Sequence, residues 1–175
     1  MSENSDFWVF GYGSLIWNPG FEFVDRTIAR LSGFHRSLCV RSHVHRGTPE
    51  TPGLVFGLDR GGSCVGMAFK VAGARHEETM AYLRARELVT HVYLEKTVSL
   101  RFLEGGGTHA VTYVVDRGHQ QYAGKISVEA AARIVMNAHG RSGPNVDYVT
   151  NALTEIHRMG LRDQWLESVA AHLRR

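Results

Sequence analysis

The sequence predicts an α+β fold, a mixed sheet or small β-barrel with helices packed outside it. Strand-like segments dominate the first half of the chain, one helical segment interrupts them, and three more helical segments fill the last third. Strands gathered before helices favour this class over a regularly alternating βα fold. The length of 175 residues predicts a single domain over residues 1–175.

The predicted strands are short runs rich in β-branched and aromatic residues, bounded by turn residues. In one of them Leu54, Phe56 and Leu58 alternate with other residues, as in a strand with one buried face. The predicted strands cover residues 7–10, 27–34, 36–42, 54–59, 64–71, 92–103 and 110–116.

The predicted helix over residues 77–89 is rich in good helix formers. Of the three later helices, the first has Ser127 as its cap and ends at Gly140, the second begins at Pro144, and the third begins near Asp163. The apolar residues that we expect to face the core are Val128, Ala131, Val135 and Ala138, then Val146, Val149, Leu153 and Ile156, and then Leu166, Val169 and Leu173.

Composition excludes several classes of protein. Hydrophobic residues make up 43% and charged residues 21%, which argues against disorder and against fibrous repeats. The net charge is +3, and the basic residues alternate with acidic ones, so we expect no nucleic-acid partner, although a small anionic substrate is favoured. Two cysteines without a C-x-x-C pair, and an opening that is neither a signal peptide nor a membrane span, predict a cytoplasmic protein without a membrane partner.

The first candidate site lies where an apolar strand, residues 7–10, runs into Gly11-Tyr12-Gly13-Ser14-Leu15. Glycine allows a ligand to approach the backbone closely, and successive amide groups in such a loop can bind an anion. Neither dinucleotide fingerprint is present. A tight turn after a core strand explains the same residues, and the motif alone favours that interpretation by roughly two to one.

Glu87 is the second candidate, because it follows Met80 and Leu83 along the apolar stripe of the helix over residues 77–89. A carboxylate that points inward has a raised pKa and can act as a general base near neutral pH. The alternative is an ordinary ion pair with Arg84, three residues back, and periodicity alone favours it by roughly three to one.

Other residues carry weaker signals. His43 and His45 would share one face of a strand, but a third ligand at a recognisable spacing is missing, so we expect solvent-facing or hydrogen-bonded histidines and no metal site. Ser14 lacks the G-x-S-x-G frame of a nucleophile. Tyr148 lies beside an apolar stripe, where a tyrosine buries its ring and keeps its hydroxyl for a partner.

Together these residues resemble the ChaC family of glutathione-specific γ-glutamylcyclotransferases, and the resemblance extends along nearly the whole chain. Its motifs recur in the family's order and spacing. They are Phe10-Gly11-Tyr12-Gly13-Ser14-Leu15-Ile16-Trp17-Asn18-Pro19, His45-Arg46-Gly47, Pro52-Gly53, Tyr82-Leu83-x-x-Arg86-Glu87 and Gly140-x-Ser142-Gly143-x-Asn145-x-x-Tyr148.

The resemblance implies a compact β-barrel flanked by helices, the γ-glutamylcyclotransferase-like fold. It implies that Glu87 is the catalytic acid/base and that Tyr148 belongs to the substrate pocket. The substrate-binding loop that it implies consists of Tyr12, Gly13, Ser14 and Leu15. The implied reaction converts glutathione to 5-oxoproline and Cys-Gly, with no metal, no organic cofactor and no obligate protein partner.

Two alternatives remain open at this point. The chain could be a cyclotransferase for other γ-glutamyl amino acids or amines, with a different leaving-group pocket. It could also be a non-catalytic module that binds glutathione. Glu87 argues against the second, since a sensor requires binding but no proton transfer.

Overall fold

A computed structural model of the chain describes residues 5–173. These residues form two compact units: the first contains residues up to 36 and residues 58–116, and the second contains residues 37–57 and those from 117 onward. A single domain over residues 1–175 stays a prediction, and residues 1–4 and 174–175 lie outside the described residues.

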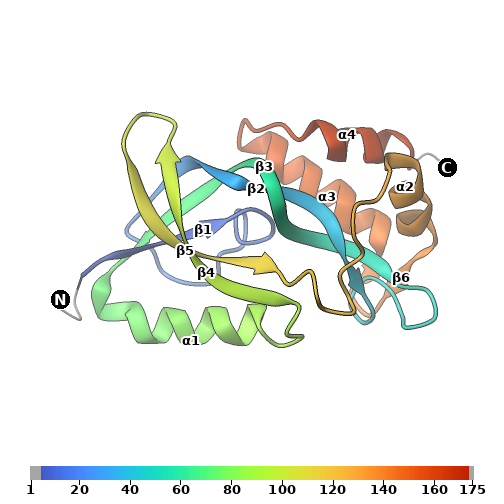
Figure 1. The fold of residues 1–175 in the computed structure, drawn as a ribbon, viewed down its shortest axis with the longest axis horizontal. Coiled ribbons are helices and arrows are strands. Elements are labelled where there is room, and N and C mark those ends of the chain that lie inside the picture. The colour runs from blue at the N-terminus through green and yellow to red at the C-terminus, as the bar shows by residue number, and fades with distance from the viewer. Residues whose placement is uncertain (1–4, 174–175) are drawn as a thin grey trace. The chain divides into compact units, whose positions relative to one another are not determined.

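The elements follow the predicted order, with strands first and most helices last (Figure 1). The strands are β1 Phe7–Gly11, β2 Asp25–Ser42, β3 Gly53–Val71, β4 Tyr93–Phe102, β5 Gly107–Val115, β6 His139–Gly140 and β7 Gly143–Pro144. The helices are η1 Gly73–Arg75, α1 His76–Glu87, α2 Val128–Asn137, α3 Asn145–Arg158 and α4 Gln164–Ala171.

The first unit contains a closed barrel with the strand order β1-β3-β2-β4-β5. β1 runs antiparallel to β3, with Phe7 opposite Val71, and parallel to β5, with Val9 opposite Val111. β4 and β5 form an antiparallel hairpin. The barrel is therefore mixed, and together with the four α-helices among the described residues it confirms the predicted α+β class.

Four of the predicted strands are in fact two long ones. Breaks were expected near residue 35 and at residues 60–63, yet β2 and β3 continue through them. The glycines there supply the reason: Gly33, Gly61 and Gly62 have φ values of +94°, +105° and +63°. Glycine adopts such values without strain, so the strands bend locally and do not end.

Helix α1 lies along the barrel and covers part of it (Figure 1). Met80 and Leu83 on its buried side belong to the same apolar cluster as Val9 of β1, Val71 of β3 and Tyr113 of β5. Burying such side chains stabilises the fold by about 1.5–3 kcal/mol each. The last turn of α1, which ends at Glu87, is thereby fixed against the barrel.

The second unit contains α2, α3 and α4, and the predicted helix starts are confirmed. The hydroxyl of Ser127 accepts a hydrogen bond from the Ala130 amide at 3.1 Å, and the carboxylate of Asp163 accepts one from the Leu166 amide at 3.0 Å. Both are N-terminal caps that satisfy amides without a partner inside the helix. The predicted stripe of α3 is only partly right, because its buried residues are Asn145, Val149, Ala152 and Ile156.

The first residue of α3, Asn145, is polar although it lies in the core, and its hydrogen bonds give the reason. Its side chain is fully buried, donates to the Leu54 carbonyl at 2.9 Å and accepts from the Leu54 amide at 2.8 Å. The side chain thus pairs with β3 as a neighbouring strand would, and it satisfies two buried backbone groups.

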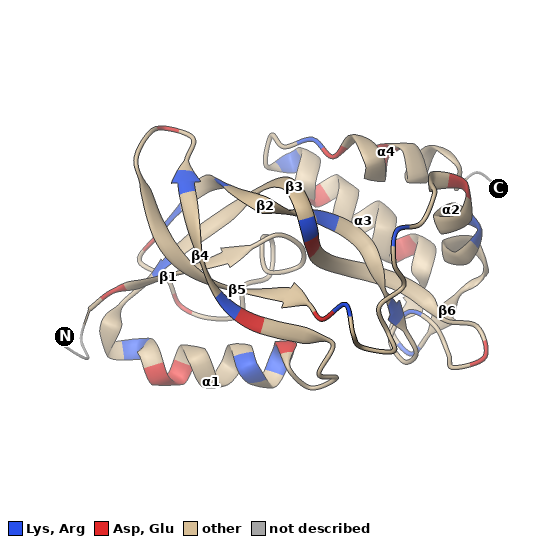
Figure 2. Ribbon diagram, in the orientation of Figure 1, with Lys and Arg blue, Asp and Glu red and all other residues tan. Residues whose placement is uncertain are grey.

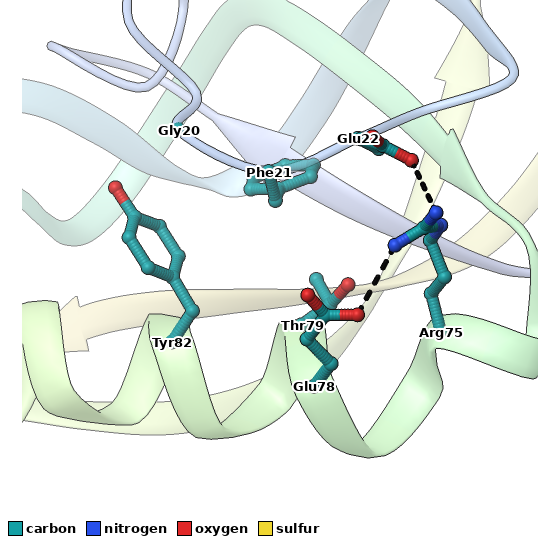
Figure 3. Close-up of a pocket in the computed structure, with 7 residues that line it drawn as sticks. All are labelled: Gly20, Phe21, Glu22, Arg75, Glu78, Thr79 and Tyr82. Carbon is teal, nitrogen blue, oxygen red and sulfur yellow. Dashed lines mark hydrogen bonds and ion pairs between the residues drawn. The ribbon is translucent and has the colours of Figure 1, made fainter.

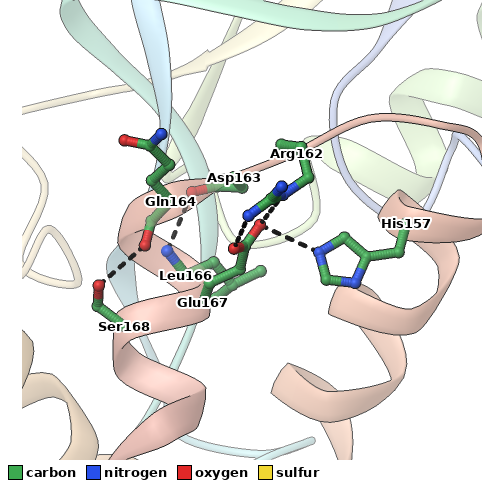
Figure 4. Close-up of polar contacts among 7 residues, drawn as sticks. All are labelled: His157, Arg162, Asp163, Gln164, Leu166, Glu167 and Ser168. Carbon is green, nitrogen blue, oxygen red and sulfur yellow. Dashed lines mark hydrogen bonds and ion pairs between the residues drawn. The ribbon is translucent and has the colours of Figure 1, made fainter.

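A polar cluster joins the end of α3 to the start of α4 (Figure 4). Glu167 accepts two hydrogen bonds from the Arg162 guanidinium, at 2.7 and 2.6 Å, and lies 3.1 Å from His157 Nε2. These contacts lower the pKa of Glu167 to about 2, the Arg162 hydrogen bonds having the largest effect. Because the cluster is exposed, its role is to orient the turn between the helices rather than to stabilise the core.

Charges of both signs are distributed over the elements, and on α1 acidic and basic residues share the same helix (Figure 2). This pattern agrees with the interspersed charges of the sequence. Within residues 5–173 no helix is long and apolar enough to cross a membrane.

Candidate active site

The chain turns sharply where β1 ends at Gly11. The Ile16 amide donates to the Gly13 carbonyl at 2.9 Å, and the Asn18 amide donates to the Ser14 carbonyl at 2.8 Å. Residues 13–18 therefore form one turn of helix-like backbone. The first amides of such a turn have no carbonyl partner within it.

The residues of the predicted substrate-binding loop, Tyr12–Leu15, differ in burial along this turn. Tyr12 is 8% and Leu15 is 5% exposed, whereas Ser14 faces solvent. The backbone N–H groups of Gly13, Ser14 and Leu15 donate to no other group among residues 5–173. Three consecutive amides of this kind are suited to bind a carboxylate or an oxyanion.

Glu87 is the last residue of α1 and lies on its buried side, which the sequence analysis considered but periodicity alone did not favour. Its side chain is 16% exposed, and burial raises the pKa of its carboxyl group. Arg86, whose Nε lies 3.7 Å from Glu87 Oε1, acts in the opposite direction and lowers the pKa. The raised pKa makes Glu87 a suitable group to accept and return a proton near neutral pH.

The alternative of an ion pair between Glu87 and Arg84 is wrong. Arg84 instead donates two hydrogen bonds to Glu95 of β4, at 3.0 and 3.1 Å. These bonds lower the pKa of Glu95, which also accepts a hydrogen bond from the Tyr113 hydroxyl at 2.9 Å. Arg84 points to β4 because the strand offers a better carboxylate partner than its own helix.

Tyr113 is a buried group near the candidate site that the sequence analysis missed. Burial is the main cause that raises the pKa of its hydroxyl, and the hydrogen bond to Glu95 and the charges of Glu95 and Glu87 act in the same direction. Tyr113 stands directly opposite Glu95 in the β4–β5 hairpin. The turn at Gly105, which has a positive φ, was the available signal, because it sets the register that pairs these two residues.

The structure brings the turn and Glu87 together within the first unit. Leu15 of the turn and Leu83 of α1 belong to the buried cluster that also contains Tyr113. Glu87 follows Leu83 by one helical turn, so the carboxylate and the amides of residues 13–15 are carried by segments that share a core. The four loop residues and Glu87 are therefore parts of one local arrangement.

Tyr148 lies in the second unit, on α3. Its hydroxyl accepts a hydrogen bond from the Phe56 amide at 3.0 Å, and the two rings lie 5.5 Å apart. The guanidinium of Arg46 lies 5.6 Å from the centre of the Tyr148 ring. The role of Tyr148 as a pocket residue stays a prediction.

The two histidines considered as metal ligands do not lie in a strand, because β2 ends at Ser42 and they follow it in a loop. That expectation was wrong. His45 Nδ1 lies 2.9 Å from the Ser142 hydroxyl, which agrees with a hydrogen-bonded histidine. In the part of the chain that the structure describes, no three His, Cys, Asp or Glu side chains are grouped to hold a metal ion.

A cavity of about 160 Å³ lies beside the N-terminal part of α1 (Figure 3). Arg75 binds Glu22 at 2.7 Å and Glu78 at 3.1 Å on its wall. The cavity contains none of the predicted site residues. Its lining consists of Gly20, Phe21, Glu22, Arg75, Glu78, Thr79 and Tyr82.

The barrel and the four α-helices of residues 5–173 define the fold. The fold is that of a γ-glutamylcyclotransferase: a crystal structure of such an enzyme from yeast, described as specific to glutathione, superposes with a TM-score of 0.85 at 21% identity, over 97% of this chain and 96% of that one. A second solved γ-glutamylcyclotransferase superposes with a TM-score of 0.57 at 16% identity, over 95% of this chain and 88% of that one.

Sequence comparison gives the family itself. Residues 7–175 match the ChaC-like protein family, and the chain belongs to it. The glutathione-specific γ-glutamylcyclotransferase of Escherichia coli is 30% identical over 96% of this chain and 73% of that relative. Glutathione-specific γ-glutamylcyclotransferase 1 of Danio rerio is 33% identical over 93% of this chain and 85% of that relative.

Proposed function

We propose that this protein is a glutathione-specific γ-glutamylcyclotransferase with Glu87 as its general acid/base. The observation that carries the proposal is Glu87 itself, a largely buried carboxylate with a raised pKa at the end of α1. It shares a packed core with a turn whose amides at residues 13–15 have no other partner among residues 5–173. The names of the relatives support the substrate.

The reaction needs one nucleophile, which the substrate supplies. The α-amine of the γ-glutamyl group attacks the γ-carbonyl carbon, a new C–N bond closes a five-membered ring, and the amide bond to cysteine breaks. The products are 5-oxoproline and Cys-Gly, and no water is consumed. The protein must therefore hold the glutamyl arm in attack geometry and move two protons, one after the other, from the attacking nitrogen to the departing one.

Glu87 performs the proton transfer in this proposal. Its carboxylate takes a proton from the α-ammonium group, which frees the amine for attack, and then gives that proton to the departing nitrogen of Cys-Gly. The attacking nitrogen loses a second proton once the ring bond has formed, and Glu87 passes it to the departing nitrogen in the same way, so Cys-Gly leaves with a protonated amine. One carboxylate with a pKa raised by burial can do both steps. The reaction returns Glu87 to its starting state.

The amides of the loop Tyr12–Leu15 bind negative charge in this proposal. They are suited to the glutamyl α-carboxylate or to the oxyanion that forms on the γ-carbonyl. Tyr148 is kept as a proposed substrate-binding residue, as the resemblance to the family implies. A cytoplasmic location also stays a prediction from the composition.

The test is to incubate the purified protein with glutathione and to measure 5-oxoproline and Cys-Gly in equal amounts. γ-Glutamyl-alanine serves as the comparison substrate, and we expect a far lower kcat/KM for it. Equal values for both substrates would favour the alternative of a broader γ-glutamyl cyclotransferase. Binding of glutathione without any product would favour the non-catalytic module.

The Glu87→Gln variant tests the role of Glu87 as the general acid/base. The amide keeps the volume and polarity of the side chain but cannot accept a proton, so kcat should fall by ~10²–10⁴-fold with little change in KM. Steady-state kinetics with glutathione measure both values. A variant that keeps a substantial fraction of the wild-type kcat would show that Glu87 is a structural residue.

A further inference from the structure

The residue beside Glu87 makes an unusual number of contacts for a helical arginine. Arg86 is 21% exposed, and its guanidinium contacts the end of the turn after β1 as well as its own helix. It donates hydrogen bonds to Ser14 Oγ at 2.8 Å, to the Asn18 carbonyl at 2.8 Å, to the Pro19 carbonyl at 3.2 Å and to the Tyr82 hydroxyl at 3.0 Å.

The contacts of Arg86 use both of its terminal nitrogens. Nη2 binds Ser14, at the start of the turn, while Nη1 binds the carbonyls of Asn18 and Pro19, just after it. One planar cation therefore holds both ends of the segment 14–19. A lysine ammonium lacks this fork of donors and cannot make the same set of bonds.

The hydroxyl of Tyr82, also on α1, contacts both Arg86 and the chain just after segment 14–19. It accepts from Arg86 and lies directly against the backbone of Gly20, where the Cβ atom of any other residue would overlap with it. Gly20 also has a φ of +76°, a conformation that favours glycine, and a side chain at this position would displace the Tyr82 ring. The chain that leaves segment 14–19 at Gly20 is therefore packed against Tyr82 of α1.

We propose that Arg86 is a positioning residue, which fixes segment 14–19 on α1 and so keeps the amides of the loop at a set distance from Glu87. The inference rests on the proposed function for its effect on catalysis. The contacts themselves stand on the structure, because Arg86 and Glu87 are adjacent on the helix and their side chains lie 3.7 Å apart. Arg86 touches no reacting atom.

The proposal predicts a particular pattern in two variants. Arg86→Lys keeps the positive charge but loses the fork, so the loop should bind substrate more weakly, and KM should rise by at least about tenfold with a smaller change in kcat. The acidic limit of the pH profile should stay in place. Arg86→Gln should raise KM similarly and also move that limit to higher pH, because the charge that lowers the Glu87 pKa is gone.

Arg75→Lys is the matched control. Arg75 precedes the same helix and binds the carboxylates of Glu22 and Glu78, with no bond to segment 14–19. We expect KM, kcat and the pH profile of this variant to equal those of the wild type. A similar rise of KM in the control would show a general effect of the helix surface and overturn the assignment to Arg86.

Amide hydrogen exchange of the ligand-free protein gives a second readout that needs no activity. Exchange of the Ile16 and Asn18 amides, which are hydrogen-bonded within the segment, should accelerate in Arg86→Lys and Arg86→Gln, while exchange over β5 stays as in the wild type. Unchanged exchange in the segment, or equal acceleration over the whole barrel, would overturn the proposal. A wild-type protein that does not convert glutathione would refute the proposed function, yet the exchange data would still decide whether Arg86 holds the segment.

Discussion

The carboxyl group of Glu87 must be ionised to accept a proton, so its pKa sets the acidic limit of the proposed reaction. Burial raises this pKa above the ordinary value of glutamate, about 4.3. We therefore expect kcat to fall as the pH drops through a pKa above that value. A pH profile of kcat measures it, and a limit at or below the ordinary value would contradict the role of burial.

The same shift has a consequence for stability. Because the folded-state pKa of Glu87 is raised, the group favours folding while it is protonated, and this contribution is lost as the pH rises through the folded-state pKa. Glu87→Gln is uncharged at every pH, so near neutral pH its Tm should equal or exceed that of the wild type. A marked loss of stability would mean that the activity of this variant reports misfolding.

Gly13 provides the test of the amide cradle. Its φ is not positive, so a side chain here meets no left-handed backbone, and the branched side chain of valine would obstruct a ligand that approaches the amides. Gly13→Val should abolish the binding of glutathione while Glu87 stays chemically intact. Calorimetry with glutathione measures it best in a Glu87→Gln background, where the ligand is not consumed. Normal binding with slow turnover would show that this loop is not the cradle.

At this scale helix periodicity placed Glu87 in line with Met80 and Leu83, but periodicity alone favoured the ion pair with Arg84, and only the resemblance to the family made Glu87 the candidate acid/base. The sequence did not predict the partners of the neighbouring arginines. Arg84 reaches β4 and Arg86 reaches the turn after β1, and both contacts join segments far apart in the chain. Only tertiary structure decides between such partners and a nearby carboxylate.

Among the elements, the first residue of α3 allows the most specific prediction about stability. Asn145→Ala would leave the amide and carbonyl of Leu54 without partners in the core, at a cost of about 1–3 kcal/mol for each group. Chemical denaturation should show that the free energy of unfolding falls by at least about 1–3 kcal/mol. Asn137→Ala is the matched control, since Asn137 is exposed and bonds only within α2; it should cost about 0.5 kcal/mol or less. Equal losses in both variants would contradict the role of Asn145.

Element boundaries were predictable where local chemistry sets them. Ser127 and Asp163 begin helices because their side chains cap the first turn, and this requires only a few neighbouring residues. The continuity of β2 and β3 was not predictable in the same way. A glycine such as Gly33 or Gly61 is compatible with both a turn and a bent strand, and pairing with other strands decides between them.

For the whole molecule, we expect activity to survive exhaustive chelation. The nucleophile belongs to the substrate, and Glu87 and backbone amides are the groups proposed for the remaining steps. Dialysis against a chelator, followed by the glutathione assay, should therefore leave kcat and KM unchanged. Loss of turnover that an added metal restores would contradict the cofactor-free mechanism.

The pairing of β1 with β5 determines when the barrel can close during synthesis. The Thr112 hydroxyl donates to the Phe10 carbonyl, a contact between residues 102 positions apart. β1 leaves the ribosome early but gains this neighbour only after residues 111 and 112 of β5 have been synthesised. Contacts of such high sequence separation slow folding. The side of β1 that pairs with β5 stays unpaired in the nascent chain for most of translation, when chaperones can bind it.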